Sequence, residues 1–209
     1  MKLFNLHLKF WYENVVMKLF LTVLILILSL QSWTKADDIS DFEIEGISIG
    51  DSLLDYVDQE FIKKTKSYLH NNNKFYTILL EEKYQTFDAI QLTILDEDTK
   101  YIIRSLTGKI FYDNENINEC YELLDSVSSE VSNILKEVII DKIKTKKIPH
   151  TADRTGNSTT KGTFFRLNKG DSVYVYCTDW SDEMEYADNL KVQIRTKSYS
   201  DWLSNEAYN

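Results

Sequence analysis

Residues 87–112 read FDAIQLTILDEDTKYIIRSLTGKIFY, and this stretch decides the fold class. Ile90, Leu92 and Ile94 stand at alternate positions with polar residues between them, the two-residue period of a half-buried strand. The acidic turn at 96–99 separates this strand from another over residues 100–112. A turn this short cannot hold a parallel crossover, so the two strands are expected to pair antiparallel.

Further strands extend this pattern in both directions along the chain. Residues 42–49 and 75–82 each alternate apolar and polar positions, and Gly108 predicts a bulge or bend inside the strand over 100–112. Residues 162–178 form a hairpin through Asn168–Asp171, and 190–196 is a last strand. The sequence leaves open whether this hairpin extends the main sheet or forms a small subdomain.

The longest helical pattern spans residues 114–147. Its apolar residues recur at spacings of three and four, which is typical of a helix with one buried face. They are Cys120, Leu124, Val127, Val131, Ile134 and Val138. A short helical turn is expected at 52–57, a helix capped by Asp58, and a terminal helix capped by Ser200. The predicted fold class is therefore α+β, an antiparallel sheet with a long helix packed on one face.

The N-terminal region has the features of an export signal. Residues 17–36 read MKLFLTVLILILSLQSWTKA, in which Lys18 precedes an uncharged run of 12 residues and Thr34 and Ala36 fit a cleavage site. A stable membrane span needs about 20 apolar residues, so cleavage is expected rather than anchoring. Residues 1–16 are interpreted as a mis-called extension, because Met17 restarts with the same four letters, MKLF, as Met1. The prediction is a single mature domain over 37–209, periplasmic or secreted, with a polar loop at 151–161.

The charge of this mature region limits its partners. Removal of residues 1–36 leaves 20 basic and 32 acidic residues, a formal charge of −12. Nucleic acids and anionic lipids both require basic patches, so neither is expected as a partner. The expected partner is an envelope protein or a small ligand, with no stable membrane span after cleavage.

Metal and cofactor sites are not expected from the sequence. The acidic stretch at 179–188 does not follow the ligand spacing of a calcium loop. The mature histidines, His70 and His150, stand far apart in the chain, which does not suggest a zinc site. No cofactor motif occurs.

The two cysteines, Cys120 and Cys177, are predicted to form a disulfide. Both lie on predicted core faces, and an even count in an exported protein permits the bond. The alternative is two buried thiols that act as small hydrophobic side chains.

Aromatic residues gather toward the C-terminus and are expected to pack in the core. The alternative is that they line a partner groove. They are Trp180, Tyr186, Tyr199, Trp202 and Tyr208.

The sequence Gly50-Asp51-Ser52-Leu53 resembles the first block of the GDSL (SGNH) esterases and lipases. The resemblance implies that Ser52 is a nucleophile at the end of a strand. The family also has an Asp-x-x-His pair near the C-terminus, but Ser67 and Lys147 stand three residues before His70 and His150. A nucleophilic serine needs such a base, so these residues are interpreted as a strand end and helix cap. A serine esterase that uses Ser52 remains the alternative function.

Four segments resemble a group of uncharacterised exported proteins from marine alphaproteobacteria with small, A+T-rich genomes. They are FEIEGISIGDSLLDY at 42–56, NECY at 118–121, YCTDW at 176–180 and SDWL at 200–203. This resemblance implies export and brings no catalytic residues. The functional prediction is a non-catalytic binding or scaffolding protein of the cell envelope.

Overall fold

A computed structural model of the chain describes residues 39–70, 72–81, 84–112 and 116–207. The predicted signal peptide at 17–36 and the extension before it lie outside the described residues.

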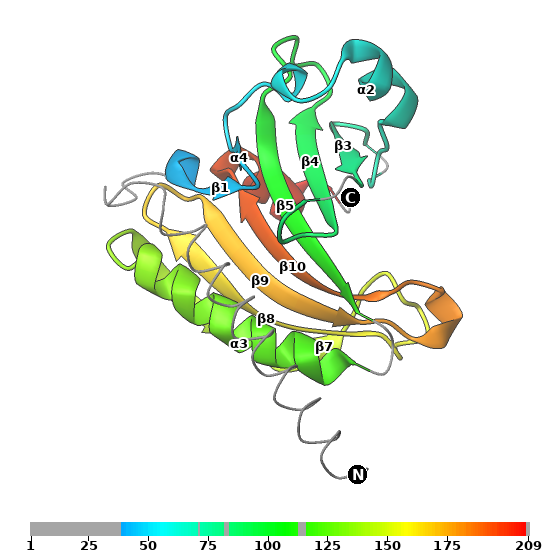
Figure 1. Ribbon diagram of the computed structural model, residues 1–209, viewed down its shortest axis with the longest axis vertical. Coiled ribbons are helices and arrows are strands. Elements are labelled where there is room, and N and C mark those ends of the chain that lie inside the picture. The colour runs from blue at the N-terminus through cyan, green and yellow to red at the C-terminus, as the bar shows by residue number, and fades with distance from the viewer. Residues whose placement is uncertain (1–38, 71, 82–83, 113–115, 208–209) are drawn as a thin grey trace, which may run out of the picture. The chain divides into compact units, whose positions relative to one another are not determined.

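The fold is dominated by one antiparallel sheet of eight strands (Figure 1). The strand order is β3-β4-β5-β10-β9-β8-β6, with the short β7 also paired to β8. Their bounds are β3 Phe75–Leu80, β4 Ala89–Leu95, β5 Ile103–Tyr112, β6 Ile139–Lys144, β7 Ile148–Pro149, β8 Thr159–Leu167, β9 Ser172–Asp179 and β10 Asp188–Arg195. The α+β class with an antiparallel sheet is confirmed. The C-terminal hairpin β8–β9 belongs to this main sheet, because β10 pairs with both β9 and β5.

The N-terminal part of the described chain forms a small separate sheet. Residues 42–49 were expected to be one strand, and this prediction is wrong. They form a hairpin of β1 (Glu43–Ile44) and β2 (Ile47–Ser48). Glu45 and Gly46 turn the chain with φ of 54° and 77°, a conformation that Gly adopts readily. The 3₁₀ turn η2 (Leu53–Asp55) and helix α2 (Gln59–Thr65) follow, with Asp58 capping α2 as expected.

One face of the sheet is an aliphatic core, and helix α3 (Ile117–Ile134) packs on the part of it formed by β8, β9 and β10 (Figure 1). A row of side chains crosses six strands on this face and is completely buried, which supplies much of the apolar burial that stabilises the fold. The row consists of Ile78, Leu92, Leu106, Ile194, Val173 and Phe165. Helix α3 buries the predicted stripe of Cys120, Leu124, Val127 and Val131. The expected cysteine pair is joined here, with 2.06 Å between the Sγ atoms of Cys120 and Cys177.

Helix α3 is shorter than the sequence pattern predicts. The helix was expected over 114–147, but it ends at Ile134, and Ile139–Lys144 forms the edge strand β6. This segment contains three isoleucines, and β-branched residues favour strands over helices. Strand β8 satisfies the backbone hydrogen bonds of β6, and β8 comes later in the chain. A local periodicity could not reveal that partner.

The predicted bulge at Gly108 is also wrong. Gly108 pairs regularly with Ile90 and Val192, and the register shift lies between Thr93 and Ile94. A Cβ atom at position 108 would lie 2.6 Å from the ring of Phe87. Glycine is therefore required here by close ring packing and not by a bend.

Candidate functional site

The second face of the sheet is polar and aromatic. Because side chains alternate along a strand, the rows next to the aliphatic row point to the opposite side. One such row contains Gln91, Thr107, Gln193, Tyr174 and Phe164. The next row on this face contains Ala89, Lys109, Lys191, Tyr176 and Gly162. Polar side chains in the middle of a sheet require hydrogen-bond partners, and a ligand bound on this face can supply them.

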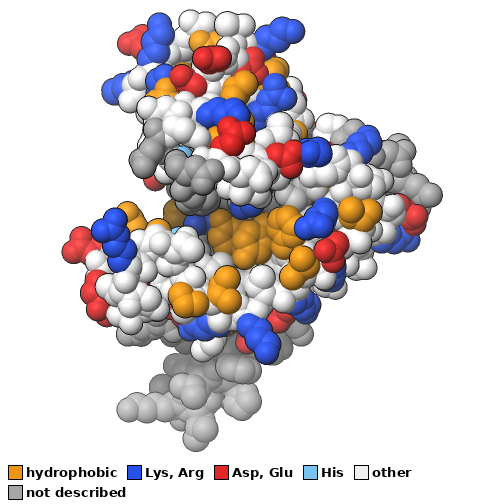
Figure 2. Space-filling model, turned by 180° about the vertical axis from the view of Figure 1, so that it is seen from behind, with side chains coloured by type: hydrophobic (Ala, Val, Ile, Leu, Met, Phe, Trp, Pro, Cys, Tyr) orange, Lys and Arg blue, Asp and Glu red, His pale blue; other side chains and the backbone are white. Residues whose placement is uncertain are grey.

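A cavity of about 870 Å³ lies over this polar face. Its floor comes from the central strands, one wall comes from the C-terminal helix with Leu69 and His70, and another comes from residues 150–152. Figure 2 shows a hollow on this side of the molecule, with hydrophobic side chains at its bottom and Lys and Arg side chains near its edge. The described lining includes Lys191, Arg195, His70 and His150 but no Asp or Glu. The chain has 33 Asp and Glu residues, yet none of them is among the described residues that line this cavity.

Lys191 and Lys109 stand directly opposite each other on β10 and β5. Like charges in this position destabilise a sheet. Burial lowers the pKa of Lys191 to about 8, and burial together with the charge of Lys191 lowers the pKa of Lys109 to about 8, although the carboxylate of Glu81 opposes part of the shift at Lys109. Lys191 Nζ lies 5.4 Å from the centre of the Tyr176 ring, a cation–π contact that offsets part of this cost. Among the described residues no ion pair reaches Lys191 or Lys109, whereas Lys66, Lys74, Lys144, Lys147 and Lys197 each pair with a carboxylate.

Arg195 provides a second cationic group further along β10. It donates a short hydrogen bond to Gln193 Oε1, and Gln193 Nε2 donates to Ser105 Oγ at 3.3 Å. Ser105 Oγ in turn donates to the carbonyl of Ile194 at 2.9 Å. This chain of hydrogen bonds orients the guanidinium. Its Nε is buried without a partner in the described part of the chain, so Arg195 keeps donor capacity for a ligand.

An aromatic platform lies beside the cationic groups. The rings of Tyr174 and Tyr176 stack at 4.3 Å with an interplanar angle of 19°. Gly162 on β8 makes room for them, because a Cβ atom there would lie 2.6 Å from Tyr176 Cβ and 2.7 Å from Tyr174 Cε2. The guanidinium carbon of Arg195 lies 5.8 Å from the Tyr174 ring centre. Each of the two tyrosine rings therefore has a cationic side chain near it, Arg195 at Tyr174 and Lys191 at Tyr176.

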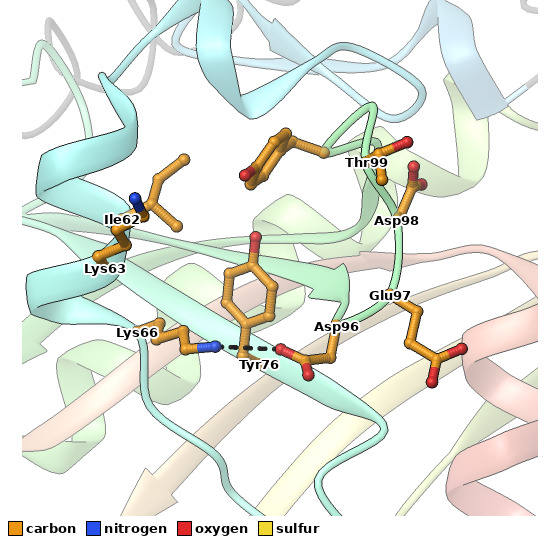
Figure 3. A pocket seen from close by; sticks show the side chains of 9 residues that line it. Ile62, Lys63, Lys66, Tyr76, Asp96, Glu97, Asp98 and Thr99 are labelled. Atoms are coloured by element: carbon orange, nitrogen blue, oxygen red, sulfur yellow. Dashed lines mark hydrogen bonds and ion pairs between the residues drawn. The ribbon is translucent and has the colours of Figure 1, made fainter.

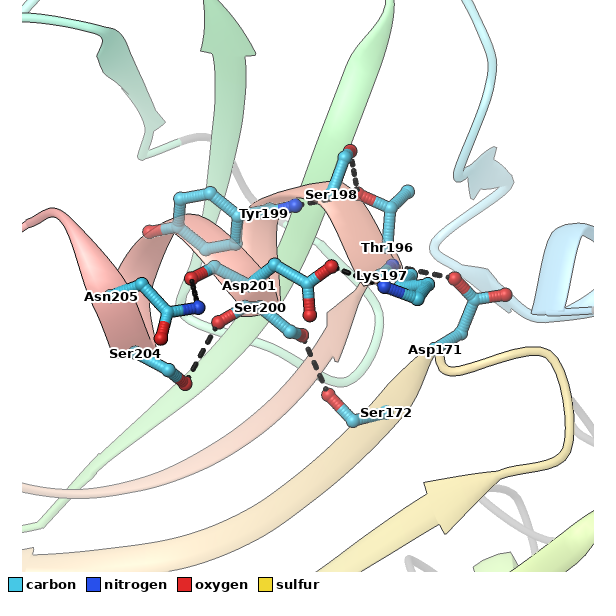
Figure 4. A network of polar contacts seen from close by, with 10 residues as sticks. All are labelled: Asp171, Ser172, Thr196, Lys197, Ser198, Tyr199, Ser200, Asp201, Ser204 and Asn205. Carbon is cyan, nitrogen blue, oxygen red and sulfur yellow. Dashed lines mark hydrogen bonds and ion pairs between the residues drawn. The ribbon is translucent and has the colours of Figure 1, made fainter.

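Helix α4 (Lys197–Asn205) forms one wall of the cavity. Its cap is Thr196 and not the predicted Ser200, because Thr196 Oγ1 accepts from the backbone N–H of Tyr199. Figure 4 shows how polar contacts fasten the helix to the β8–β9 turn. Asp171 Oδ1 accepts from the backbone N–H of Lys197 at 2.7 Å, and the hydroxyls of Ser200 and Ser172 lie 3.1 Å apart.

The apolar side of α4 anchors it to the sheet. Tyr199 and Trp202 are buried, and their ring centres lie 5.1 and 4.7 Å from that of Phe75. Trp202 also meets the ring of His70 edge-on at 5.0 Å. Two of the five C-terminal aromatics therefore pack in this core, as expected, while Tyr208 lies outside the described residues.

The other wall is the start of the loop from His150 to Ser158, of which residues 150–152 line the cavity. The backbone N–H of Ala152 donates to His150 Nδ1 at 3.2 Å, so a neutral His150 carries its proton on Nε2. Burial and then the charge of Lys191 lower the pKa of His150, which places the imidazole and this lysine in one electrostatic environment. The ring of Trp180 lies 4.3 Å from that of His150, and Tyr186 continues the stack at 5.0 Å.

Asp153 holds this loop in place. Its carboxylate accepts hydrogen bonds from the N–H and hydroxyl groups of both Thr155 and Ser158, at 2.6–2.8 Å, and from Ser181 Oγ at 3.1 Å. The bonds from Ser158 and then Thr155 hold the pKa of Asp153 well below its usual value. Such a carboxylate stabilises the fold only while it is ionised.

Replacing Asp153 by alanine is expected to lower the melting temperature at pH 6 and to have less effect in acid. The folded-state pKa is depressed, so the contribution is complete above the unfolded value of about 3.9 and is lost as the pH falls below it. Thermal unfolding of both proteins between pH 6 and pH 2 measures this difference. Glu183→Ala, a change at an exposed acid of the neighbouring turn η3 (Asp182–Met184), is the control. A difference between wild type and Asp153→Ala that stays constant with pH would contradict the assignment.

A second, smaller cavity of about 210 Å³ lies between α2 and the β4–β5 turn (Figure 3). The hydroxyl of Tyr76 points into it and has no hydrogen-bond partner among the described residues. Two of the carboxylates that line it, Asp96 and Asp98, are already paired. Asp96 accepts from Tyr68 and pairs with Lys66 at 3.2 Å, and Asp98 pairs with Arg104 at 3.3 Å. This cavity is a weaker candidate for a ligand site.

Ser52, the residue of the alternative esterase hypothesis, lies outside the lining of either cavity. Its hydroxyl donates to the carbonyl of Lys100 at 3.0 Å and accepts from the N–H of Leu54 at 3.3 Å, which caps η2. The two histidines considered as its base, His70 and His150, both line the large cavity.

The described residues contain no group of three or more His, Cys, Asp or Glu side chains arranged to hold a metal ion. Nor do the described helices include one with the length and apolar character needed to cross a membrane.

Comparisons with known proteins found no family model, no curated protein and no solved structure that matches this chain. The resemblance to exported alphaproteobacterial proteins therefore stays a prediction.

Sequence reasoning missed Lys109, Lys191 and Arg195 as candidate site residues. The signal available was charge at alternate positions of two predicted buried strands, where Lys191 and Arg195 share a face with Gln193. The sequence did not show which side of the sheet this face belongs to, or which residues lie opposite Lys191 and Arg195. Both depend on the pairing of β10 with β5 and β9.

Proposed function

We propose that this protein is a non-catalytic binding protein of the cell envelope, whose cavity holds a small anionic organic molecule. The observation that carries the proposal is Lys191, which lines a cavity without any described carboxylate and stands directly opposite a second lysine, Lys109. A buried like-charge pair costs stability, and binding sites commonly hold such unfavourable arrangements because a ligand relieves them.

The size and chemistry of the cavity support a small organic ligand. Ligand pockets usually span about 300–1,000 Å³ and combine apolar walls with a few polar groups, and a cavity of about 870 Å³ falls in this range. Tyr176, Tyr199 and Leu203 supply apolar surface, while Lys191, Gln193 and Arg195 supply donors on one strand. A carboxylate is an acceptor that suits all three of these donors.

Export to the periplasm is part of the proposal. It is supported by the sequence pattern at residues 17–36 and by the cysteine pair at bonding distance. An envelope binding protein can capture a nutrient or signal molecule without catalysing its conversion.

The test is a binding screen with paired ligands. Purified protein is titrated with carboxylates of increasing size and with the corresponding primary amides, and heat or tryptophan fluorescence is recorded. We expect carboxylates to bind, amides to bind more weakly, and affinity to fall with added salt and above pH 8, where Lys191 loses its proton. Equal affinity for the acids and their amides would contradict the proposal.

The Ser52 esterase is the alternative function. It predicts hydrolysis of short-chain esters that disappears in Ser52→Ala, whereas the binding proposal predicts no turnover in either protein. The same substitution removes a capping hydroxyl, so unfolding must be measured beside activity.

A further inference from the structure

The cavity contains an amine in an unusual setting. Most ion-paired lysines of the described chain lie at the surface, where a carboxylate keeps the side chain protonated. Lys191 is half-buried, lies against the Tyr176 ring, and has the cationic Lys109 as its cross-strand neighbour.

We propose that Lys191 forms a reversible imine with a carbonyl group of the bound anion, so that the ligands are carboxylates that also carry an aldehyde or ketone. This inference rests on the proposed function, because the anionic group must first bring the ligand into the cavity. Lys109 lies opposite Lys191, so its charge adds to the positive potential that attracts the anionic end.

The protonation state of the lysine agrees with this geometry. An amine attacks a carbonyl only in its neutral form, and a lysine that is desolvated or adjacent to another cation is activated in this way. Because burial lowers the pKa of Lys191 to about 8, a substantial fraction is neutral near pH 7.5, whereas an exposed lysine is almost wholly protonated.

The reaction balances without any other reactant. The lone pair of Lys191 Nζ forms a bond to the carbonyl carbon, and a carbinolamine results. The carbonyl oxygen then leaves as water with two protons, and a C=N double bond remains. His150 lines the same cavity and carries its neutral-state proton on Nε2, so it is a donor suited to the departing oxygen. Hydrolysis reverses every step.

Reductive trapping tests the proposal. The full protein is incubated at pH 7.5 with pyruvate or 4-formylbenzoate and sodium cyanoborohydride, and modified lysines are mapped by peptide mass spectrometry. Hydride addition to the imine carbon gives a stable secondary amine. We expect Lys191 to be modified at least about ten-fold faster than any exposed lysine.

Variants and matched ligands separate this inference from the proposed function. Lys191→Arg keeps the positive charge and removes the nucleophile, so it should bind lactate and 4-(hydroxymethyl)benzoate but yield no cavity adduct. Lys161→Arg is the control, because Lys161 also lies over a tyrosine ring, Tyr121 at 4.6 Å, but on the α3 face of the sheet.

Each outcome is decisive. Binding of the hydroxy acids together with adducts spread evenly over the lysines would overturn the imine and leave anion binding intact. Failure of both hydroxy and oxo acids to bind, with no preferred adduct, would overturn the imine for these ligands and count against the binding proposal too.

Discussion

Replacing Lys191 by methionine should reduce the affinity for a bound carboxylate by at least about 30-fold. Removing one partner of a buried charge pair typically costs about 2 kcal/mol or more, and about 1.4 kcal/mol is a factor of ten. Methionine has a similar length and no charge, so the cavity keeps its approximate shape. Calorimetric titration of both proteins with the best carboxylate from the screen measures the loss.

The same substitution should stabilise the unliganded protein. It removes a half-buried cation and its repulsion with Lys109, and uncharged replacements of buried ionic groups are often stabilising. The folded-state pKa of Lys191, about 8, lies below the unfolded value of about 10.4. The wild-type protein therefore becomes more stable as the pH rises from 8 to 10, and the advantage of Lys191→Met should shrink over that range.

Lys161→Met is the matched control for this experiment. Lys161 lies on the adjacent strand β8 and points to the opposite face, so its loss should leave carboxylate affinity unchanged. If Lys191→Met bound the carboxylate as tightly as wild type does, Lys191 would have no role in binding. A melting temperature below that of wild type at pH 7 would show that the lysine is structural.

Reduction of the disulfide should destabilise the protein by about 4 kcal/mol. Cys120 in α3 and Cys177 in β9 are separated by 57 positions, and closing a loop of that length restricts the unfolded chain by about this amount. For a chain of this size the loss corresponds to a fall in melting temperature of roughly 8–16 °C. Thermal unfolding with and without a phosphine reductant gives the value.

The Cys120→Ala/Cys177→Ala double variant is the control for this reduction. Its melting temperature should be low already and should not change with reductant. Alkylation of native protein supplies an independent check, since two reactive thiols before reduction would show that the bond is not formed. The alternative interpretation of buried free thiols predicts no shift in wild type either.

The sequence by itself determined the elements whose pattern is local. The alternation in residues 75–112 predicted β3, β4 and β5, and the turns between them required antiparallel pairing. The 3–4 spacing from Cys120 to Val131 predicted the buried face of α3. Both cysteines could be placed on core faces from the same periodicities. Such patterns are visible because each residue's environment repeats along its own element.

Tertiary structure decided the rest, because hydrogen-bond partners and neighbours come from distant parts of the chain. Residues 139–144 continue a helical pattern, yet pairing with β8 makes them a strand. The cationic cavity depends even more on such pairing. Lys109 and Lys191 become opposed only when β10 inserts between β5 and β9, and α4 and the loop at 150–152 then enclose Lys191. Both lysines can be read from the sequence, but only the register of the strands shows that they lie directly opposite each other.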